Sequence, residues 1–350
     1  MELPIHRKPL LYVTLVIAAL FAIYLSTFTH ARSLDAYFPK VPSFPELTHS
    51  ATYSLNTPPG KRFDASGLAY DTRTKRLFTI NDKLDHLDIF SITLGKKKGA
   101  FDYPASLKRA LRGKDTYPHK GKGSWHSTLD TEGIARCGAY FYMMSERKSL
   151  VYRVHAKTGK TTHHLLAYKT YRAQHPKQTK KWKALDRFAN AGFEGIACSQ
   201  KHQALYLIKE RGPRFILVTN MPTGTTHSPL TIKTHFDTPH LGLPQKVAGR
   251  TCPPDFGGAA VFGDFLYVLY RNARAIQKVD LKTFKTVATQ SFAKTVKNLY
   301  TRDKPYGFAE GIVVTQANIY LIFDNNARAR INQPKNRQPA LLAFTRPKDF

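Results

Sequence analysis

The sequence predicts an all-β protein, a β-propeller with five or six four-stranded blades, preceded by one N-terminal transmembrane helix. Three observations support this prediction. A long apolar run opens the chain, a glycine-centred strand motif occurs five times after it, and each copy of the motif is followed by a second apolar strand. The polar residues that flank these strands then predict a binding site at one end of the ring.

The first 30 residues predict a membrane anchor. Arg7 and Lys8 precede an uncharged, apolar run over residues 10–28, which is long enough to cross a bilayer as a helix. Positive charge before the run keeps the N-terminus in the cytoplasm and exports the rest of the chain. We therefore expect a single-pass protein of the cell inner membrane with its main domain on the periplasmic side. A signal peptide cleaved near Ala31 is the alternative, although the run is longer than the usual apolar core of such peptides.

Three segments follow from this reading. Residues 1–30 are the membrane anchor or signal segment, residues 31–49 are a tether that contains Pro39, Pro42 and Pro45, and residues 50–350 are the propeller domain. Prolines favour an extended spacer. The last segment is long enough to bury a large core.

The charge of the chain indicates the kind of partner. There are 54 Lys and Arg against 24 Asp and Glu, a formal net charge of +30, and such a charge attracts anions over long range. Because we expect the domain to be exported, the expected partner besides the membrane is an anionic small molecule or an acidic envelope polymer, and nucleic acid is not expected. Basic insertions at residues 96–98, 108–122 and 177–183 would add to this attraction, unless they only keep the protein soluble.

The cysteines permit at most one disulfide. Cys137, Cys198 and Cys252 lack the close paired spacing of a zinc site. An oxidising compartment allows one bridge, and the sequence leaves the pair open.

Five segments of the chain align with one another. They are residues 66–71, 132–137, 194–199, 257–262 and 310–315. Each is followed, after a short turn, by an apolar and aromatic strand, at residues 76–80, 140–144, 205–208, 265–270 and 319–323, which predicts hairpins. Four of them continue into a third strand, at residues 87–92, 150–154, 215–218 and 275–279.

The period of the repeat suits a propeller blade. The shared glycine recurs at Gly67, Gly133, Gly195, Gly258 and Gly311, at intervals of 66, 62, 63 and 53 residues, enough for four strands with their loops. Terminal strands at residues 53–55 and 341–344 either share one blade, which would close the ring and protect its edges, or belong to a sixth blade.

Polar residues of the repeats are expected at one mouth of the ring, because the first strand of an up-and-down sheet starts on the face where the second strand ends. Glu132, Glu194 and Glu310 start the first strands of their repeats. The second strands end in Asn81 and Asp82, Glu146 and Arg147, Glu210 and Arg211, Arg271 and Asn272, and Asp324 and Asn325.

Three converging carboxylates repel one another unless positive charge compensates them. A divalent cation, calcium first and magnesium or manganese next, would be bound by Glu132, Glu194 and Glu310. Further oxygen ligands would come from Asn81, Asp82, Asp324 and Asn325. Alternatively, each glutamate pairs with Arg147, Arg211 or Arg271 and locks neighbouring blades together.

Arginines at the same mouth suit an anionic ligand, since the guanidinium group donates paired hydrogen bonds to phosphate or carboxylate. Arg147, Arg211 and Arg271, with Lys209, are the candidate ligand contacts. His126 is a conceivable acid or base, but a loop histidine is more often a surface residue. The common nucleophile and phosphate-loop motifs are missing, so no catalytic residue is assigned and any hydrolysis would depend on metal-activated water.

Several of these motifs resemble those of the SdiA-regulated (YjiK-like) family, within the broader phytase-like propellers that are described by the esterase-like activity of phytase. The motifs lie at residues 66–68, 78–81, 144–147, 192–197, 209–211 and 309–312, and the resemblance covers nearly all of residues 50–345. It implies an exported propeller, often behind a membrane segment, with a calcium site in the Glu-Gly corners. Ser66 and Gly257 stand where three other repeats have glutamate, which leaves room for a ligand or removes the multi-metal arrangement of phytases.

Three functional hypotheses follow. The first is a membrane-anchored propeller that binds a cation and an anionic ligand at one mouth. The second is a metal-dependent phosphoesterase, and the third is a non-catalytic envelope scaffold whose basic loops recognise lipid or protein.

Overall fold

The computed structural model describes the chain in several ranges. They are residues 43–57, 63–84, 86–95, 102–114, 129–146, 149–176, 192–210, 214–224, 227–241, 246–247, 250–251, 255–297, 309–324, 330, 333 and 335–350. Within these ranges there is no helix of the length and apolarity that a membrane crossing requires. The predicted membrane segment at residues 10–28 lies outside them.

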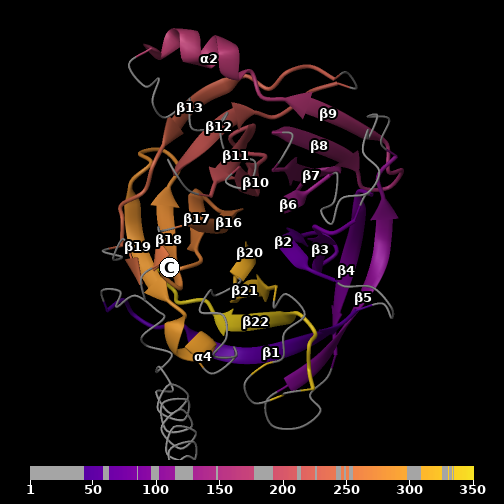
Figure 1. The fold of residues 1–350 in the computed structure, drawn as a ribbon, viewed down its shortest axis with the longest axis vertical. Helices are drawn as coiled ribbons and strands as arrows, with labels where there is room; N and C mark the ends of the chain where they lie inside the picture. The colour runs from indigo at the N-terminus through magenta and orange to yellow at the C-terminus, as the bar shows by residue number, and fades with distance from the viewer. Residues whose placement is uncertain are drawn as a thin grey trace, which may run out of the picture.

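Five four-stranded units, here called blades, form a propeller-like ring (Figure 1). Blade 1 consists of β2 (Ala65–Asp71), β3 (Arg76–Asn81), β4 (Asp88–Leu94) and β5 (Asp102–Arg112). Blade 2 consists of β6 (Thr131–Cys137), β7 (Tyr140–Ser145), β8 (Leu150–His155) and β9 (Thr161–Leu165). Blade 3 consists of β10 (Phe193–Ser199), β11 (Ala204–Lys209), β12 (Phe215–Asn220) and β13 (Ile232–Phe236).

Blade 4 consists of β16 (Phe256–Phe262), β17 (Phe265–Tyr270), β18 (Ala275–Asp280) and β19 (Thr286–Ser291). Blade 5 consists of β20 (Ala309–Val314), β21 (Asn318–Phe323), β22 (Ala340–Thr345) and β1 (Thr48–Asn56). Outside the blades lie the helices α2 (Tyr168–Gln174) and α4 (Ala293–Lys297) and a small hairpin of β14 (Lys246–Val247) and β15 (Arg250–Thr251). The all-β prediction and the predicted hairpins are confirmed, and the first, second and third strands of the repeats begin and end within two residues of the predicted positions.

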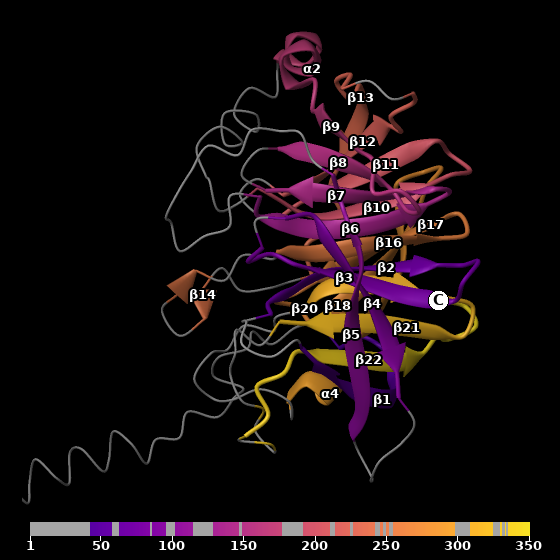
Figure 2. The same ribbon diagram turned by 90° about the vertical axis from the view of Figure 1, so that its right-hand side faces the viewer.

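The two ends of the described chain share one blade, and for this reason the described ring has five blades and not six. Strand β1 pairs antiparallel with β22, from Thr48 opposite Thr345 to Ser54 opposite Ala340. On its other side β1 pairs in parallel with β5, so blades 5 and 1 form one continuous sheet (Figure 2). Pairing of both outer strands leaves no open edge at this junction.

The last residues of the predicted tether belong to the ring. The Leu47 amide donates to the Ser291 carbonyl at 2.8 Å, and the Ser291 amide donates to the Pro45 carbonyl at 2.8 Å. The Glu46 Oε1 atom accepts from the Lys294 amide at 2.7 Å. Residues 45–47 therefore attach to blade 4, and β1, which completes blade 5, begins directly after them at Thr48.

The hydrophobic core is divided among the junctions between blades. Each of five apolar clusters contains side chains from two neighbouring blades. At the junction of blades 1 and 2, for example, Phe78 meets Phe141 edge to face with ring centroids 5.0 Å apart. Because each middle strand is covered on both faces, it is rich in apolar residues, and all six residues of β11 are buried.

A ring of glycines closes the centre. A Cβ atom on Gly67 would lie 3.0 Å from the Gly133 Cα, and one on Gly133 would lie 2.9 Å from the Gly195 Cα. The same approach continues from Gly195 to Gly258, from Gly258 to Gly311 and from Gly311 back to Gly67. The inner strands therefore meet backbone to backbone, which only a residue without a side chain permits.

The disulfide joins two inner strands. Cys137 ends β6 and pairs with Cys198 near the end of β10, with the two Cα atoms 6.2 Å apart. It lies beyond the glycine ring in the direction of the inner strands, and we call this end of the molecule the far face. Cys252 lies outside the described residues.

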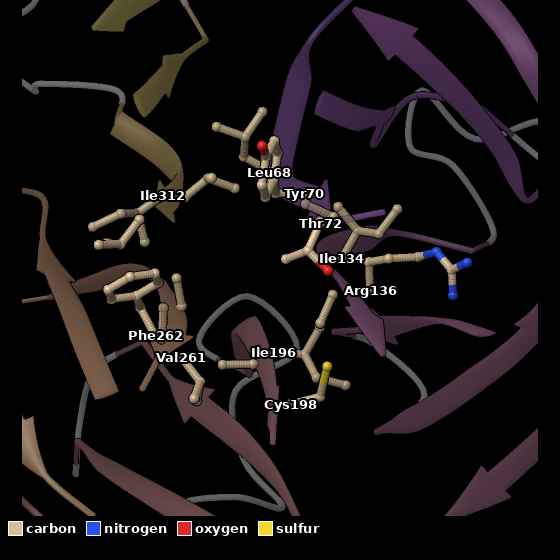
Figure 3. Close-up of a pocket in the computed structure, with 17 residues that line it drawn as sticks. Leu68, Tyr70, Thr72, Ile134, Arg136, Ile196, Cys198, Val261, Phe262 and Ile312 are labelled. Atoms are coloured by element: carbon tan, nitrogen blue, oxygen red, sulfur yellow. The ribbon is translucent and has the colours of Figure 1, made fainter. Parts of the chain in front are cut away.

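Between the glycine ring and the far face, the bore is apolar. A cavity of about 120 Å³ is lined by the residues that follow each glycine, Leu68, Ile134, Ile196, Ala259 and Ile312. Figure 3 shows these side chains gathered around the centre, with Arg136 extending away from it. The polar residues of the repeats therefore lie at the opposite end of the inner strands.

The glycine ring predicts a graded response to added methyl groups. In Gly311→Ala the new Cβ would lie 2.5 Å from backbone atoms of Gly67 and Leu68, whereas in Gly258→Ala the nearest atoms are 3.4 Å away. We expect Gly311→Ala to lower the free energy of unfolding by about 3 kcal/mol and the melting temperature by roughly 5–10 °C. Gly258→Ala, the matched control, should change both much less. Equal melting temperatures for the two variants, measured by circular dichroism, would contradict this account of ring closure.

Candidate functional site

A bulge in the inner strands directs the predicted glutamates into one mouth of the ring. Pairing of the first two strands is interrupted at Glu132, Glu194 and Glu310 in blades 2, 3 and 5. A bulge turns the extra residue away from the regular alternation of the strand. The residue before each central glycine thus points toward the axis, at the end of the strand that we call the acidic mouth.

The ends of the second strands add another ring of residues. The amides of Asp82, Glu146, Glu210 and Arg271 donate to the carbonyls of Asp64, Asp130, Gly192 and Asp255, respectively, at 2.9–3.3 Å. These four residues therefore occupy equivalent positions in blades 1 to 4, and Asp324 follows β21 in blade 5. Arg271 stands where the other four blades have a carboxylate.

A third set of acidic residues precedes the inner strands. Asp64, Asp130 and Asp255 each lie three residues before the central glycine of their blade. Together with the two other sets they bring ten carboxylates to the mouth, namely Asp64, Asp82, Asp130, Glu132, Glu146, Glu194, Glu210, Asp255, Glu310 and Asp324. In a chain with a net charge of +30, this end is locally acidic.

Arg271 is the centre of an ion-pair network that crosses three blades. Its Nη1 atom donates to both oxygens of Glu310, at 2.8 and 2.6 Å, and its Nη2 donates to Glu210 at 2.5 Å. Its Nε donates to Asp255 at 3.1 Å, and Glu194 lies 3.7 Å from Nη1. Burial alone would lower the pKa of Arg271, but these carboxylates raise it well above the ordinary value.

Two repeats lack a glutamate before the central glycine, and a different feature takes its place in each. At Gly257 a Cβ atom would lie 2.3 Å from the Ala309 carbonyl oxygen, so the neighbouring backbone fills that space and leaves no room for a ligand. At Ser66 the hydroxyl donates to the Glu132 carbonyl at 2.7 Å and to its Oε2 at 2.9 Å. Ser66 therefore positions Glu132 instead of supplying a carboxylate.

Two overlapping carboxylate triads are spaced for a metal ion. Asp130, Glu132 and Glu146 each offer an oxygen, and these oxygens lie within 4.8 Å of one another. Glu146, Glu194 and Glu210 form a second such group. Glu146 belongs to both, so the pair of triads spans blades 2 and 3.

Close packing of these acids changes their titration. Burial, followed by the negative charges of Asp82, Asp130, Glu146 and Glu310, raises the pKa of Glu132 well above its ordinary value. Burial also raises the pKa of Glu194, although Arg271 opposes the shift. Burial raises the pKa of Asp82 to about 7 despite contact with Lys83. Burial would lower the pKa of Lys83, but Asp82 outweighs it and the net shift is upward.

Of the predicted metal ligands, Glu132, Glu194 and Glu310 converge on the mouth, as do Asp82 and Asp324. The Asn81 Oδ1 atom accepts from the amides of Asp64 and Lys83 at 3.2 and 3.0 Å, which gives it a turn-forming role. Asn325 lies outside the described residues. Glu310 is bound by Arg271, whereas Glu132 lies in a triad without arginine.

Of the predicted ligand contacts, Arg271 forms ion pairs with carboxylates of the protein. Lys209 is fully buried, with an exposed fraction of 0%. Arg147, Arg211 and the conceivable acid or base His126 lie outside the described residues. The sequence reasoning missed Asp64, Asp130 and Asp255, and it listed Glu146 and Glu210 without assigning them a role. The repeated aspartate three residues before the glycine was the signal that would have found the first set.

Residues 64–327 match the family model Phytase-like, described as the esterase-like activity of phytase. The chain belongs to this phytase-like family. The match extends from the first aspartate of the acidic mouth to beyond β21, so it contains all three sets of mouth residues. No curated protein matches the chain.

Solved structures resemble the chain at low identity. Glutaminyl cyclase from Myxococcus xanthus aligns with a TM-score of 0.47 and 11% identity, over 87% of this chain and 100% of that one. The PQQ-bound aldose sugar dehydrogenase from Streptomyces coelicolor aligns with a TM-score of 0.40 and 12% identity, over 86% and 100%. A luciferin-regenerating enzyme aligns with a TM-score of 0.42 and 10% identity, over 83% and 94%.

The Arg271 network predicts a large stability loss on removal of its cation. Arg271→Met would leave Glu310, Glu210 and Asp255 buried without their partner, and we expect a loss of about 3–5 kcal/mol in the free energy of unfolding. The control is Arg112→Met, which removes a half-exposed partner of Asp88 and should cost about 1 kcal/mol or less. Urea unfolding of both variants measures the difference. Similar losses in the two would show that the network contributes no more than a surface ion pair.

The raised pKa of Asp82 predicts a pH dependence in metal-free protein. Between the unfolded value near 3.8 and the folded value of about 7, the native state binds a proton that the unfolded chain has released. Stability is therefore expected to fall as pH rises through this window, and Asp82→Asn should flatten the fall. The measurement is the melting temperature against pH with a chelator, with exposed Asp264→Asn as the control. Identical pH profiles for wild type and Asp82→Asn would refute the assignment.

Proposed function

We propose that the acidic mouth binds a divalent cation, calcium being the best match, and that the bound cation recruits an anionic ligand. The observation that carries this proposal is the pair of overlapping triads that share Glu146. Oxygen-only ligands in flexible number are the set that calcium prefers. A bound cation would also offset the repulsion among Asp130, Glu132 and Glu146.

The residues present fit such an ion. The Asp82 Oδ1 atom is buried and has no hydrogen-bond partner within the described ranges, and burial of an unpaired carboxylate oxygen is unfavourable. The upward pKa shift of Glu132 reflects repulsion that a cation would relieve. We assign Asp130, Glu132 and Glu146 as the principal ligands, with Glu194, Glu210 and Asp82 next to them.

The locked and open parts of the mouth have different roles in this proposal. Around Arg271, carboxylates and guanidinium neutralise one another and join blades 3, 4 and 5. Around Glu132, carboxylates predominate among the residues that the structure describes, and Lys83 opposes them through Asp82 and Asp64. The anionic ligand would therefore be held through the cation at Glu132, with Arg147 and Arg211 as the predicted direct contacts.

A metal-dependent phosphoesterase is the second candidate function. The description of the family names an esterase-like activity of phytase. Glu132, whose pKa is raised by burial and by neighbouring carboxylates, is suited to hold and return a proton, and Ser66 fixes the Glu132 carboxylate by a hydrogen bond to Oε2. A bound cation would supply charge neutralisation and lower the pKa of a coordinated water.

We further propose that the ring works outside the cytoplasm, tethered to the inner membrane by residues 10–28. The apolar run and the resemblance to the SdiA-regulated branch of the family support this placement. The Cys137–Cys198 disulfide supports it as well, since such bonds persist in oxidising compartments. A non-catalytic envelope scaffold, the third hypothesis, would have the same location but would bind no ligand at the mouth.

Calcium titration of the full chain in detergent tests the proposal. We expect saturable binding with a dissociation constant of about 10⁻⁴ M or tighter, and a rise in melting temperature with calcium. Glu132→Gln and Glu146→Gln should each weaken binding by about tenfold or more, whereas Asp264→Asn, an exposed acid at the far face, should leave it unchanged. Absence of calcium binding in the wild type would overturn the cation site and leave the scaffold hypothesis.

Turnover separates the first two hypotheses. Hydrolysis of a chromogenic phosphate monoester that requires calcium and disappears in Glu132→Gln would establish the phosphoesterase. Calcium binding without hydrolysis would support a binding protein.

A further inference from the structure

The far face contains a basic cavity that the acidic mouth does not explain. It has a volume of about 220 Å³ and is lined by Tyr140, Arg153, His155, Lys160 and Gly224, among others. Strand β8 runs from the mouth toward the far face, so Arg153 and His155 near its end lie beside the start of β9. Gly224, in the segment that follows β12, brings blade 3 to the rim of the cavity.

Arg153 is an almost completely buried cation, with an exposed fraction of 8%. Its guanidinium carbon lies 3.6 Å from the centroid of the Tyr140 ring, and its Nη1 donates to the Gly224 carbonyl. Its Nε atom is buried and has no hydrogen-bond partner, and no carboxylate pairs with the guanidinium in the part of the chain that the structure describes. A buried charge in this condition is unfavourable unless an opposite charge joins it.

The other polar groups of the cavity are also arranged to donate. The Thr158 amide donates to the His155 Nδ1 at 3.3 Å, so the neutral imidazole carries its proton on Nε2. Lys160, exposed at the rim, contributes a second full positive charge. The walls of the cavity thus combine guanidinium, ammonium and imidazole groups without a carboxylate.

The surroundings strengthen the positive potential. A larger cavity of about 740 Å³ shares His155 and is lined by Arg73, Arg76 and Lys157. Its one carboxylate, Asp71, is paired with Arg136 at 3.3 Å. A ligand with its negative group in the Arg153 cavity could therefore extend into the larger cavity and contact further positive side chains there.

We propose that the Arg153 cavity binds the phosphate group of a small molecule or of a lipid, independently of any metal. Arg153, His155 and Lys160 line the same cavity, and donors on three separate side chains suit a tetrahedral phosphate better than a planar carboxylate. This site lies at the opposite end of the strands from the acidic mouth. The proposal of a phosphate site therefore does not depend on the proposal of a cation site.

Titration calorimetry with inorganic phosphate, in the presence of a chelator, tests the proposal on the full chain in detergent. We expect one saturable site in the wild type, and Arg153→Met, which retains the bulk but removes the charge and the donors, should weaken it by at least about tenfold. Lys160 is exposed, so Lys160→Ala should fold normally, and we expect it to bind phosphate severalfold more weakly. This variant tests the proposal even if Arg153→Met is unstable. Lys282→Ala, on an exposed turn of blade 4 at the same face, is the matched control and should bind like the wild type.

Vesicles distinguish the two sources of phosphate. Phosphatidylcholine vesicles with added phosphatidic acid should retain the wild type more than Lys160→Ala if the ligand is a lipid headgroup, and equally if it is a soluble phosphate. Either result supports the site, provided that inorganic phosphate binds. Absence of saturable phosphate binding in the wild type, or equal affinity in wild type and Lys160→Ala, would overturn the proposal. Because a chelator is present, a failed calcium site does not affect this outcome.

Discussion

Backbone contact among the five inner strands is the constraint on which the rest of the molecule depends. At Gly67, Gly133, Gly195 and Gly311 each strand approaches the next so closely that a side chain would overlap main-chain atoms, whereas at Gly258 the approach is an ordinary van der Waals contact. This contact sets the radius of the ring and places the apolar bore on one side of the glycines. On the other side, bulges in four of the strands release the preceding residue from the sheet pattern and turn it toward the axis. Ring closure and the presentation of Glu132, Glu194 and Glu310 are thus two consequences of one local geometry.

Electrostatics then divides the mouth. A repeated sequence would place like charges at every equivalent position, and repulsion would oppose the fold. Blade 4 breaks the repeat, since Arg271 replaces a carboxylate and Gly257 replaces a glutamate. The space left at Gly257 is occupied by the backbone of blade 5, and the guanidinium of Arg271 gathers carboxylates from blades 3, 4 and 5. Blades 1 and 2 keep their acids, with Lys83 beside Asp82, and burial together with the negative charges of its neighbours raises the pKa of Glu132.

The two ends of the ring have opposite character. The mouth gathers ten of the 24 acidic residues of the chain, whereas the ionisable residues that line the far-face cavities are arginine, lysine, histidine and tyrosine, apart from Asp71. Between them lie the glycine ring and an apolar bore, which keep the two charged regions apart. A cation at one end and a phosphate group at the other would each meet a complementary field, and the overall charge of +30 conceals this division.

The sequence by itself determined the repeat, its successive hairpins, and the shared face of Glu132, Glu194 and Glu310, because alternation, turn residues and period are local properties of the chain. Whether the terminal strands share one blade or belong to a sixth was left open, and the pairing of β1 with β22 and β5 decided it. Only the tertiary structure decided which charges meet. Arg271 and Glu310 are 39 residues apart, and Arg153 and Gly224 are 71 residues apart. Their contacts depend on how neighbouring blades rotate against one another, as does the choice of Cys137 and Cys198 as the disulfide pair. Ion pairing, burial and cavity lining arise between blades, where sequence distance carries no information, and for that physical reason the site required the assembled ring.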